Sequence, residues 1–270
     1  ETEALEIKEY FDYILILSPE SSCRFLHNFV YTINSLESII KFPSNCRVEL
    51  KIDTGMHRNG INMHELSEAM TRIKKSSLNL EAIFTHYRSA DTMNSEWFWQ
   101  SKNFEAIKRS YPHLRTHSCN SAAIFRENNF NEDMVRIGIA AYGCLKMDKG
   151  FNETGLQPVL SLIATKISSR TLQKGQSIGY NASFEAKEEM RVSNYDIGYS
   201  DGFPRMLSNV FISPDKFKLL GHVSMDNSSY ACTDDELLIF NDANTIASEA
   251  NTIAYEILTS LSVSLKRKIL

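Results

Sequence analysis

The sequence predicts an α/β protein in two parts: a parallel sheet alternating with helices, and then a domain rich in β-strands. Strand-like and helix-like segments alternate up to about residue 155, which is the rhythm of a parallel sheet. Polar residues repeatedly follow the predicted strands, as they do at the active rim of a (β/α) barrel or of an open doubly wound sheet. After about Pro158 the segments become short and strand-like, and Gly, Asn and Asp interrupt them.

The composition restricts the classes of protein to which the chain can belong. It has 270 residues, 43 % hydrophobic and 23 % charged, as is usual for a globular protein. A net charge of −4 gives no argument for binding to nucleic acid, and no apolar run approaches the roughly 20 residues of a membrane-spanning helix. Five scattered cysteines without a CxxC motif predict a reducing compartment, the cytoplasm, with most thiols in the core. No spacing of His, Cys and Asp resembles a metal site.

The first part alternates between predicted strands and helices. Strands are expected at 13–17, 48–52 and 80–84, and within "LRTHSCNSAAIF" and "MVRIGIAAYG". Helices are expected at 36–40, after Asn62, and in "NSEWFWQSKNFEAIKRSYP". Asn62 and Glu65 fit a capping box, which marks the start of the middle helix.

The second part is predicted to be a separate domain of short strands. These strands are expected in "PVLSLIATKISSRTL", "QSIGYNASF", "MRVSNYDIGYSDGF", "KLLGHVSMDNSSYACT" and "DELLIFND". A final helix is expected from Asn251 to about Lys266. We therefore divide the chain into a first domain at 1–155 and a β-rich domain at 156–270.

The segment "VELKIDTGMHRNGI" places opposite charges and two glycines directly after one strand. Lys51 and Asp53 are consistent with a solvated ion pair at a strand end, since charges usually lie in water. Gly55 and Gly60, however, bracket Arg58 and indicate a constrained loop. Arginine is also the usual residue for holding a carboxylate or a phosphate in a fixed plane.

Asn120 and Ser121 precede small, helix-favouring residues in "HSCNSAAIF". They fit an ordinary N-cap, and they also fit an anion cradle, because helix N-termini favour phosphate. No GxGxxG or GxxxxGK[ST] motif occurs, so a dinucleotide or a P-loop phosphate is not indicated.

Arg136 lies within the apolar stretch "VRIGIAAYG". A buried arginine needs a partner or a ligand, and Gly138 would allow a backbone N–H to approach that ligand closely. His86 and His117, taken singly, fit satisfied core histidines.

The second part contains further candidates that have ordinary explanations. Three tyrosines fit packing residues: Tyr180, Tyr199 and Tyr255. Asp201 and Asp226 fit turns, since Gly or Asn follows each of them. Neither turn explains the nearby Arg205 and Met225.

Taken together, eight segments resemble the bacterial alanine racemase family, whose members use pyridoxal phosphate (PLP). They occur in the family's order and cover nearly the whole chain: "KIDTGMHRNGI", "FTHYRSAD", "HSCNSAAIF", "VRIGIAAYG", "GQSIGYNASFEA", "DIGYSDGFPRMLS", "VSMDN" and "TIAYEIL". The resemblance implies a (β/α)8 barrel that carries PLP, followed by a β-strand domain, in a homodimer with shared active sites. It implies racemisation of L-alanine to D-alanine for peptidoglycan.

Other functions remain open at this stage. A racemase of the same fold could act on other amino acids, because pocket size decides specificity. A non-catalytic PLP-binding protein would not be expected to carry the second domain with Tyr180. A barrel that binds a sugar or a metabolite would leave Arg136 unexplained.

The resemblance also implies roles for the residues of the first part. Arg58 would contact the PLP phenolate oxygen and the substrate carboxylate, with support from Lys51, which is often carbamylated (N-carboxylysine) in this family. Arg136 would face the pyridine nitrogen, within a supporting network of His86, His117, Tyr199 and Arg205. The residues matched to phosphate binding are Ser121, Gly138, Ile139 and Tyr255, with Asn120 beside them.

In the second part, Tyr180 matches the tyrosine that acts as acid and base on one face of the substrate Cα. Met225 and Asp226 match residues that line the substrate pocket from the other subunit. The lysine that attaches PLP covalently has no counterpart, because neither Lys8 nor Lys41 lies in the family's motif. We therefore expect the first barrel strand and this lysine to lie upstream of Glu1.

Overall fold

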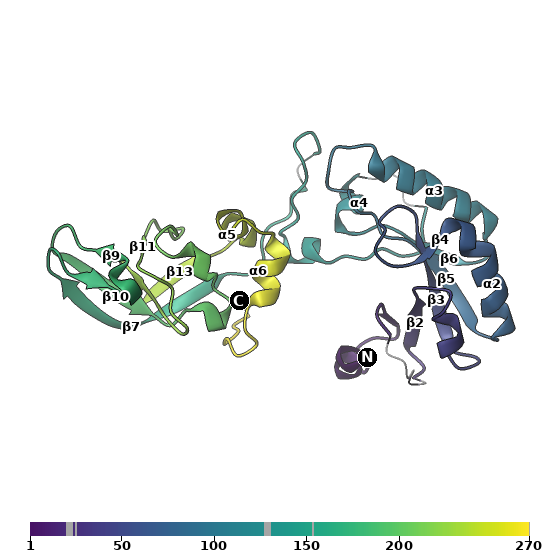
Figure 1. The fold of residues 1–270 in the computed structure, drawn as a ribbon, viewed down its shortest axis with the longest axis horizontal. Helices are drawn as coiled ribbons and strands as arrows, with labels where there is room; N and C mark the ends of the chain where they lie inside the picture. Colours follow the sequence, from purple (N-terminus) through teal and green to yellow (C-terminus); the bar gives the residue numbers. More distant parts are fainter. Residues whose placement is uncertain (20–23, 25, 127–130, 153, 270) are drawn as a thin grey trace. The chain divides into compact units, whose positions relative to one another are not determined.

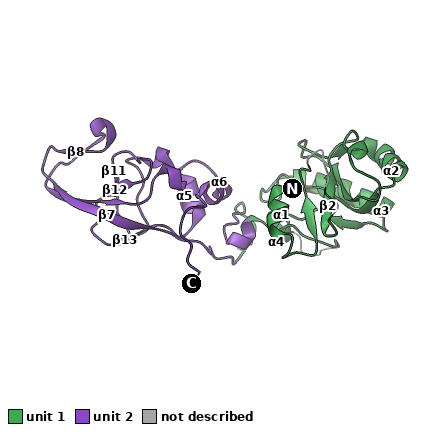
Figure 2. Cartoon of the chain, turned by 90° about the horizontal axis from the view of Figure 1, so that it is seen from below, with its two compact units in different colours: residues 1–138, 147–154 green, residues 139–146, 155–270 purple. Residues whose placement is uncertain are grey.

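The computed structural model describes residues 1–19, 24, 26–126, 131–152 and 154–269. Within these ranges the chain forms two compact units (Figure 2). The first unit contains residues 1–138 and 147–154, and the second contains residues 139–146 and 155–270. Each unit has its own hydrophobic core.

The first unit is built on a parallel sheet (Figure 1). Its main strands lie in the order β1-β2-β3-β5-β6, and the short β4 pairs with β3. This order has no reversal, so it matches a (β/α) barrel rather than a doubly wound sheet. The strands are β1 (Ile14–Ile16), β2 (Phe29–Ile33), β3 (Arg47–Asp53), β4 (Ile61–Asn62), β5 (Asn79–Phe84) and β6 (Arg115–His117).

Four α-helices and two short 3₁₀ turns accompany this sheet. They are α1 (Thr2–Ile7), α2 (Leu66–Lys75), α3 (Glu96–Ser110), α4 (Ser121–Arg126), η1 (Ile39–Lys41) and η2 (Met63–Glu65). The predicted capping box is confirmed, because the Glu65 carboxylate accepts the backbone N–H of Asn62 at 2.9 Å.

Strand β3 has one apolar face and one charged face. Val48, Leu50 and Ile52 are fully buried in a cluster that also contains residues of α2. Burying side chains of this size contributes roughly 1.5–3 kcal/mol each. Because side chains alternate along a strand, Glu49 and Lys51 point to the opposite face. The apolar face thus stabilises the unit and leaves the other face for polar chemistry.

The second unit contains a five-stranded antiparallel sheet in the order β11-β12-β10-β7-β13 and a separate β8-β9 hairpin. The strands are β7 (Leu162–Leu172), β8 (Ser177–Ile178), β9 (Phe184–Glu185), β10 (Met190–Tyr195), β11 (Leu219–Leu220), β12 (Ser228–Tyr230) and β13 (Glu236–Phe240). The helices and turns are η3 (Ile139–Tyr142), η4 (Tyr180–Ala182), η5 (Tyr199–Asp201), η6 (Arg205–Leu207), α5 (Ala243–Glu249) and α6 (Ala254–Ser260).

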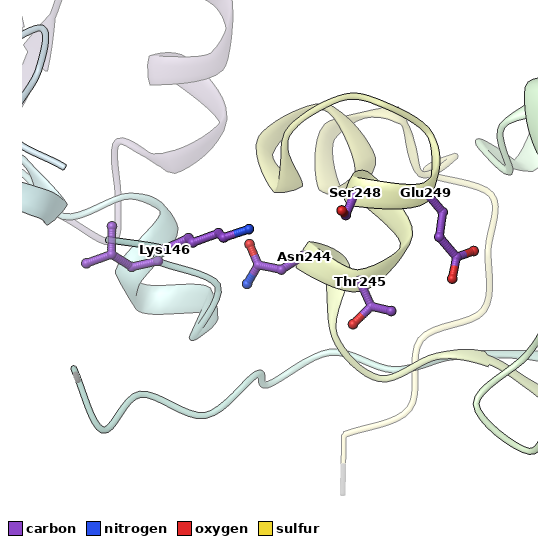
Figure 3. A pocket seen from close by; sticks show the side chains of 6 residues that line it. Lys146, Asn244, Thr245, Ser248 and Glu249 are labelled. Atoms are coloured by element: carbon purple, nitrogen blue, oxygen red, sulfur yellow. The ribbon is translucent and has the colours of Figure 1, made fainter. Parts of the chain in front are cut away.

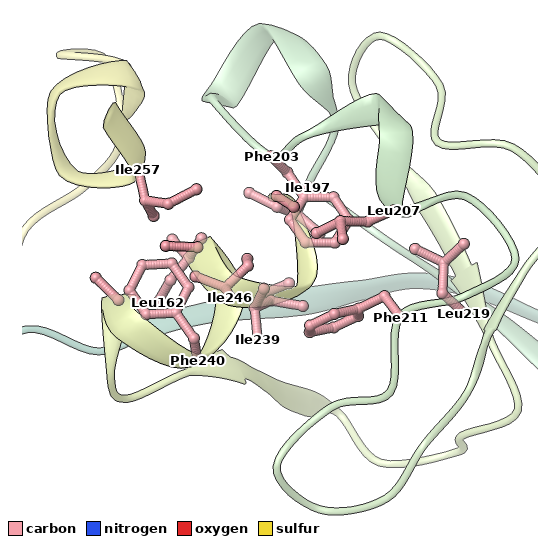
Figure 4. Close-up of a cluster of buried hydrophobic side chains, with 14 of the residues drawn as sticks. Leu162, Ile197, Phe203, Leu207, Phe211, Leu219, Ile239, Phe240, Ile246 and Ile257 are labelled. Atoms are coloured by element: carbon pink, nitrogen blue, oxygen red, sulfur yellow. The ribbon is translucent and has the colours of Figure 1, made fainter. Parts of the chain in front are cut away.

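The core of the second unit joins the sheet to the two helices (Figure 4). Leu162 and Ile239 come from strands β7 and β13, while Ile246 and Ile257 come from α5 and α6. Phe203 and Phe211 pack edge to face, with ring centroids 5.3 Å apart. This cluster fixes the loops that follow β10, where several predicted site residues lie.

Two sequence predictions are wrong. Residues 134–138 of "MVRIGIAAYG" form no strand, and a 3₁₀ turn follows them. The amide N–H groups of Thr116 and Ser118 donate to the side chains of Asp133 and Glu132, at 2.8 and 2.5 Å, so they are not available to pair with a strand. The long final helix is also wrong: α6 begins at Ala254 and ends at Ser260.

The cysteines of the described residues lie where the sequence predicts them. Cys46, Cys119, Cys144 and Cys232 are buried, as expected, and Cys23 lies outside the described residues. None of the helices in the described ranges is long and apolar enough to cross a membrane.

The capping box gives a stability prediction. Asn62→Ala should lower the free energy of unfolding by about 1 kcal/mol, because it removes the side-chain part of the cap. Chemical denaturation measures the change. Ser67→Ala, at an exposed position of α2, is the matched control and should change stability by less than about 0.5 kcal/mol. Equal effects of the two substitutions would contradict a capping role.

Candidate active site

Arg136 is held at the carboxyl end of the parallel sheet by acceptors from two segments, residues 85–86 and residues 117–118. Its Nη2 donates to the carbonyls of Thr85 at 2.7 Å and Ser118 at 3.3 Å, and to Nδ1 of His86 at 3.4 Å. Its Nη1 donates to Nδ1 of His117 and, at 3.3 Å, to the His117 carbonyl. Within the described residues the Nε–H of Arg136 has no acceptor. One donor of a fixed guanidinium is therefore left for a ligand.

His117 connects Arg136 to a buried carboxylate. Its Nε2 lies 2.7 Å from Oε2 of Glu49, and both side chains are completely buried. The imidazole stacks on Phe84 with a centroid distance of 4.6 Å and an interplanar angle of 11°. The Arg136 guanidinium lies over the same Phe84 ring, 5.2 Å from its centroid. The aromatic ring thus fixes both partners in one stack.

The network continues on the same face of the sheet toward the amino ends of the strands. Tyr13 donates its hydroxyl to Oε1 of Glu49 at 2.5 Å and accepts from Nη2 of Arg115 at 2.7 Å. The same Arg115 nitrogen bonds Glu81 at 3.0 Å, and Glu81 also pairs with Arg47. A chain of hydrogen bonds and ion pairs therefore runs from the amino ends of the strands to Arg136.

The titration of these groups follows their surroundings. Burial, the neighbouring Arg136 and Arg58, and Lys51 lower the pKa of His86 to about 4. Burial also lowers the pKa of His117, against the raising effect of the Glu49 hydrogen bond. Burial raises the pKa of Glu49, but the hydrogen bonds that its carboxylate accepts from His117 and Tyr13 outweigh burial and hold that pKa below its usual value. The carboxylate is therefore ionised while both imidazoles are neutral.

Lys51 is half-buried next to two arginines. Burial lowers its pKa first, and the charges of Arg58 and Arg136 lower it further, while Asp53 opposes them. The described part of the chain gives Lys51 no ion pair. A lowered pKa increases the fraction of neutral amine, which is the form that reacts with carbon dioxide.

Arg58 stands on a loop that is fixed at both ends. The Oδ1 of Asp53 accepts the backbone N–H groups of Gly55 and Met56 at 2.9 Å and of His57 at 3.1 Å. Gly60 has a φ of +114°, and a Cβ there would lie 2.9 Å from the backbone nitrogen of Asp53. The loop is therefore constrained, as the two glycines predict, while the Arg58 side chain is exposed.

Helix α3 supports the two loops at this edge of the sheet. Gln100 is buried, with its Nε2 donating to the His86 carbonyl at 3.1 Å and its Oε1 accepting the N–H of Arg88 at 3.0 Å. Asn103 donates to the carbonyl of Thr54 at 3.3 Å. These bonds tie the loops after β3 and β5 to one rigid helix.

Ser121, Gly138 and Asn120 lie together after β6. The Gly138 N–H donates to the Ser121 hydroxyl at 2.9 Å, and a Cβ at Gly138 would meet no atom within 4 Å. Asn120 caps α4 by accepting the N–H of Ala123 at 3.0 Å, and it donates to the Tyr87 carbonyl at 2.9 Å. The space beside Gly138 is thus open, and Asn120 acts as the N-cap.

The predicted residues of the second unit lie on turns. Tyr180 follows Gly179, which has a φ of +77°, and its side chain is 66 % exposed. Asn181 and Ala182 also have positive φ values, 58° and 49°, so the turn is tight. The turn therefore presents the tyrosine to solvent within this chain.

A second group of predicted residues is held by a close backbone approach. A Cβ at Gly198 would lie 2.1 Å from the Met225 carbonyl oxygen, so only glycine fits there. The Ser200 hydroxyl donates to that carbonyl at 2.8 Å and to Oδ1 of Asp226 at 2.9 Å. These contacts place the turn of Tyr199 beside Met225 and Asp226.

Three predicted residues lie elsewhere in the second unit. Arg205 is exposed at the start of η6, and Tyr255 is half-exposed near the start of α6. Ile139 is buried and begins η3. A surface pocket of about 540 Å³ in this unit contains none of the predicted residues (Figure 3). It is lined by Leu145, Lys146, Asn244, Thr245, Ser248 and Glu249.

Sequence reasoning missed Glu49, Tyr13 and Gln100. Glu49 follows the alternation of β3, so its position resembled the solvent face of an ordinary strand. Its signal was the repetition of charged residues at 47, 49, 51 and 53 on one strand of a sheet expected to be buried. The described residues contain no cluster of three or more His, Cys, Asp or Glu arranged for a metal ion.

Comparison with known proteins gives one family. Residues 2–159 match the family described as "Alanine racemase, N-terminal domain", and residues 159–269 match "Alanine racemase, C-terminal domain". The chain is 40 % identical over 274 residues to the alanine racemase of a Nitratiruptor species. This match covers 98 % of the chain and 80 % of that relative.

Solved structures of the same family share the fold. The alanine racemase from E. faecalis matches with a TM-score of 0.84 and 26 % identity, covering 97 % of this chain and 80 % of that one. The alanine racemase from Bartonella henselae with covalently bound pyridoxal phosphate matches with a TM-score of 0.82 and 27 % identity, covering 99 % and 82 %. The predicted (β/α) barrel followed by a β-rich domain is confirmed.

The lowered pKa of His86 gives a pH prediction. Between its ordinary pKa of 6.5 and about 4, the unfolded chain binds a proton that the folded chain does not bind. Stability that is present above pH 6.5 is therefore lost as the pH falls toward 4. His86→Gln should reduce this loss, measured from urea midpoints between about pH 7 and pH 5. The exposed control His113→Gln should keep the wild-type slope; if His86→Gln keeps it too, His86 is not the group that titrates.

Proposed function

This chain belongs to the alanine racemase family and racemises alanine, and we propose that it does so with PLP at the carboxyl end of its parallel sheet. The proposal extends to a cytoplasmic homodimer that supplies D-alanine for peptidoglycan. Residues 1–155 would form the PLP-binding domain and residues 156–270 the domain that completes the site of the other subunit. The observation that carries the proposal is Arg136, a guanidinium fixed by five hydrogen bonds with its Nε–H unused among the described residues.

The residues at this edge fit PLP. Open space beside Gly138 and the Ser121 hydroxyl would receive the phosphate, with Ile139 and Tyr255. Asn120 would contribute indirectly by capping α4, since its amide oxygen and nitrogen both have protein partners. Arg136 would donate its Nε–H to the pyridine nitrogen.

The chemistry depends on an arginine at the pyridine nitrogen. PLP, when bound, withdraws electrons from the substrate and so makes its Cα proton removable. Arg136 hydrogen-bonds the ring nitrogen without protonating it, because a guanidinium does not give up its proton in proteins. The withdrawal is then moderate. This arrangement favours return of the proton to Cα, which is racemisation, over its transfer elsewhere, which is transamination.

Other residues would bind the substrate and move its proton. Arg58, exposed on a constrained loop, would hold the substrate carboxylate in a fixed plane. Met225 and Asp226 would line the pocket, and Tyr199 with Arg205 would support it. Tyr180 would add or remove the proton on one face of Cα. The family assigns the opposite face to the lysine that attaches PLP, whose motif has no counterpart in residues 1–270.

The first test of this function is Tyr180→Phe in the full-length gene product. The substitution removes the hydroxyl and leaves the cofactor site intact, so PLP should still bind. Racemisation should fall by about 10²–10⁴-fold, the usual contribution of an acid–base group. Solvent-deuterium exchange at Cα, followed by NMR, should be lost more from one enantiomer than from the other. Equal and near-normal exchange from both enantiomers would refute the assignment.

The second test concerns Lys51. A carbamate on this lysine would place an anion next to Arg58 and so hold the guanidinium in position. Lys51→Ala should lower activity, and added acetate should restore part of it, whereas Lys74→Ala on the exposed face of α2 should do neither. Intact mass spectrometry and racemase assays provide the measurements. An unmodified lysine in active enzyme, together with full activity of Lys51→Ala, would rule out this role.

A further inference from the structure

We infer that Glu49 is a positioning residue for the reaction: it fixes the tautomer of His117, so that the imidazole accepts from Arg136 and holds the guanidinium toward the cofactor. The inference rests on the proposed function, which places Arg136 at the pyridine nitrogen. It assigns a role to a carboxylate that lies on the same face of β3 as Lys51, two residues before it.

The first step of the argument is the direction of the hydrogen bond between Arg136 and His117. A guanidinium has five N–H donors and no acceptor. The Nδ1 of His117 bonds Arg136, so Nδ1 must be the unprotonated nitrogen. An imidazolium would carry a proton on Nδ1, directly against the N–H of Arg136, so the ring is neutral and its proton is on Nε2. Burial lowers the pKa of His117, which favours the same neutral state.

The second step is the acceptor for that proton. The Nε2 of His117 lies in a completely buried position, where an unsatisfied N–H would be costly. Among the described residues its partner is Oε2 of Glu49, at 2.7 Å. An ionised carboxylate only accepts, so it requires the proton on Nε2 and excludes the other tautomer. If the proton moved to Nδ1, it would point at an N–H of Arg136.

The third step is that Glu49 cannot turn away. Its other oxygen accepts the Tyr13 hydroxyl at 2.5 Å and lies 3.7 Å from Nη2 of Arg115. In the sheet, Glu49 is in register with Thr32 on β2 and Ala82 on β5, which leaves it in the buried centre of the strands. Tyr13 and Arg115 thus hold one oxygen of the carboxylate, and the other oxygen holds His117.

A purely structural role makes a different prediction. If Glu49 served only to neutralise Arg115, removing it would lower the stability of the protein. Its kcat and KM would then change no more than those of another variant that is destabilised by the same amount. If Glu49 orients Arg136, the loss should appear in kcat and in cofactor binding while KM for alanine stays nearly constant. A lower kcat with unchanged KM indicates a group that acts beyond ground-state binding of the substrate.

The experiment compares four variants of the full-length, PLP-loaded protein. Glu49→Leu removes the acceptor, and Glu49→Gln restores one, because the amide oxygen can accept from Nε2 of His117. Thr32→Val is the control for a change in the same buried layer, since its hydroxyl has no hydrogen-bond partner in the described residues. Val48→Ala is the control for lost stability, because Val48 is buried on the opposite face of β3.

Glu49→Leu should lower kcat by about 10- to 100-fold, the size of effect typical for losing a carboxylate that orients a metal-binding histidine. It should also weaken PLP binding, change the cofactor's absorption band, and leave KM for alanine within about threefold. Glu49→Gln should recover most of the loss. Thr32→Val should match the wild type in kcat and in PLP binding. Val48→Ala should lower the melting temperature about as much as Glu49→Leu does, but it should keep the wild-type kcat. Equal kcat in Glu49→Leu and Val48→Ala, or wild-type PLP binding in Glu49→Leu, would overturn the inference.

A measurement on the wild type keeps the test decisive if Glu49→Leu does not fold. ¹⁵N NMR of histidine-labelled protein, with the signal assigned through His117→Gln, should show a protonated Nε2 and an unprotonated Nδ1. The opposite tautomer, or an imidazolium, would overturn the inference. This readout does not depend on racemase activity. A wild type with the expected tautomer but no racemase activity would therefore refute the proposed function, whereas an active wild type with the wrong tautomer would refute the role of Glu49.

Discussion

The site depends on how a guanidinium is kept charged and immobile after it leaves water. Removing an ion from water costs several kcal/mol unless partners replace its hydration. Arg136 finds these partners in carbonyls from two segments and in two neutral imidazoles. Each partner constrains another group: the imidazole of His117 requires Glu49, and Glu49 requires Tyr13 and Arg115. The position of one donor is therefore determined by a network that extends across the sheet.

The two faces of strand β3 have different roles. The apolar residues of one face pack against α2 and supply stability, while Glu49 on the other face bonds His117 and so belongs to the network around Arg136. A buried ion network gives little net stability, because desolvation offsets the attraction between charges. What it gives here is a fixed geometry, which the proposed role of Arg136 at the pyridine nitrogen requires. The loop that carries His86 gains a similar rigidity from Gln100, and the loop that carries Arg58 gains it from Asn103, which bonds the carbonyl of Thr54.

Local pattern was enough for much of this structure. Val48, Leu50 and Ile52 mark β3, and the Asn62–Glu65 box marks the helix that follows. The resemblance named His86 and His117, both of which bond Arg136. The errors arose where contacts between residues far apart in the sequence determine the local structure. The side chains of Glu132 and Asp133 accept the backbone N–H groups of Ser118 and Thr116, with which a strand at 134–138 would have to pair. Asn251 has a φ of 50°, which is not helical, so the expected final helix cannot begin there. Glu49 was missed because its partners lie far away in the sequence, at positions 13, 115 and 117.

A crystal structure of the full-length protein loaded with PLP tests the central claim most directly. We predict that the Nε–H of Arg136 donates to the pyridine nitrogen at about 3 Å. We also predict that its Nη groups keep their bonds to His117 and Thr85, and that Glu49 still accepts from Nε2 of His117. A pyridine nitrogen that faces a carboxylate, or an Arg136 turned away from the ring with the His117–Glu49 pair broken, would contradict the account.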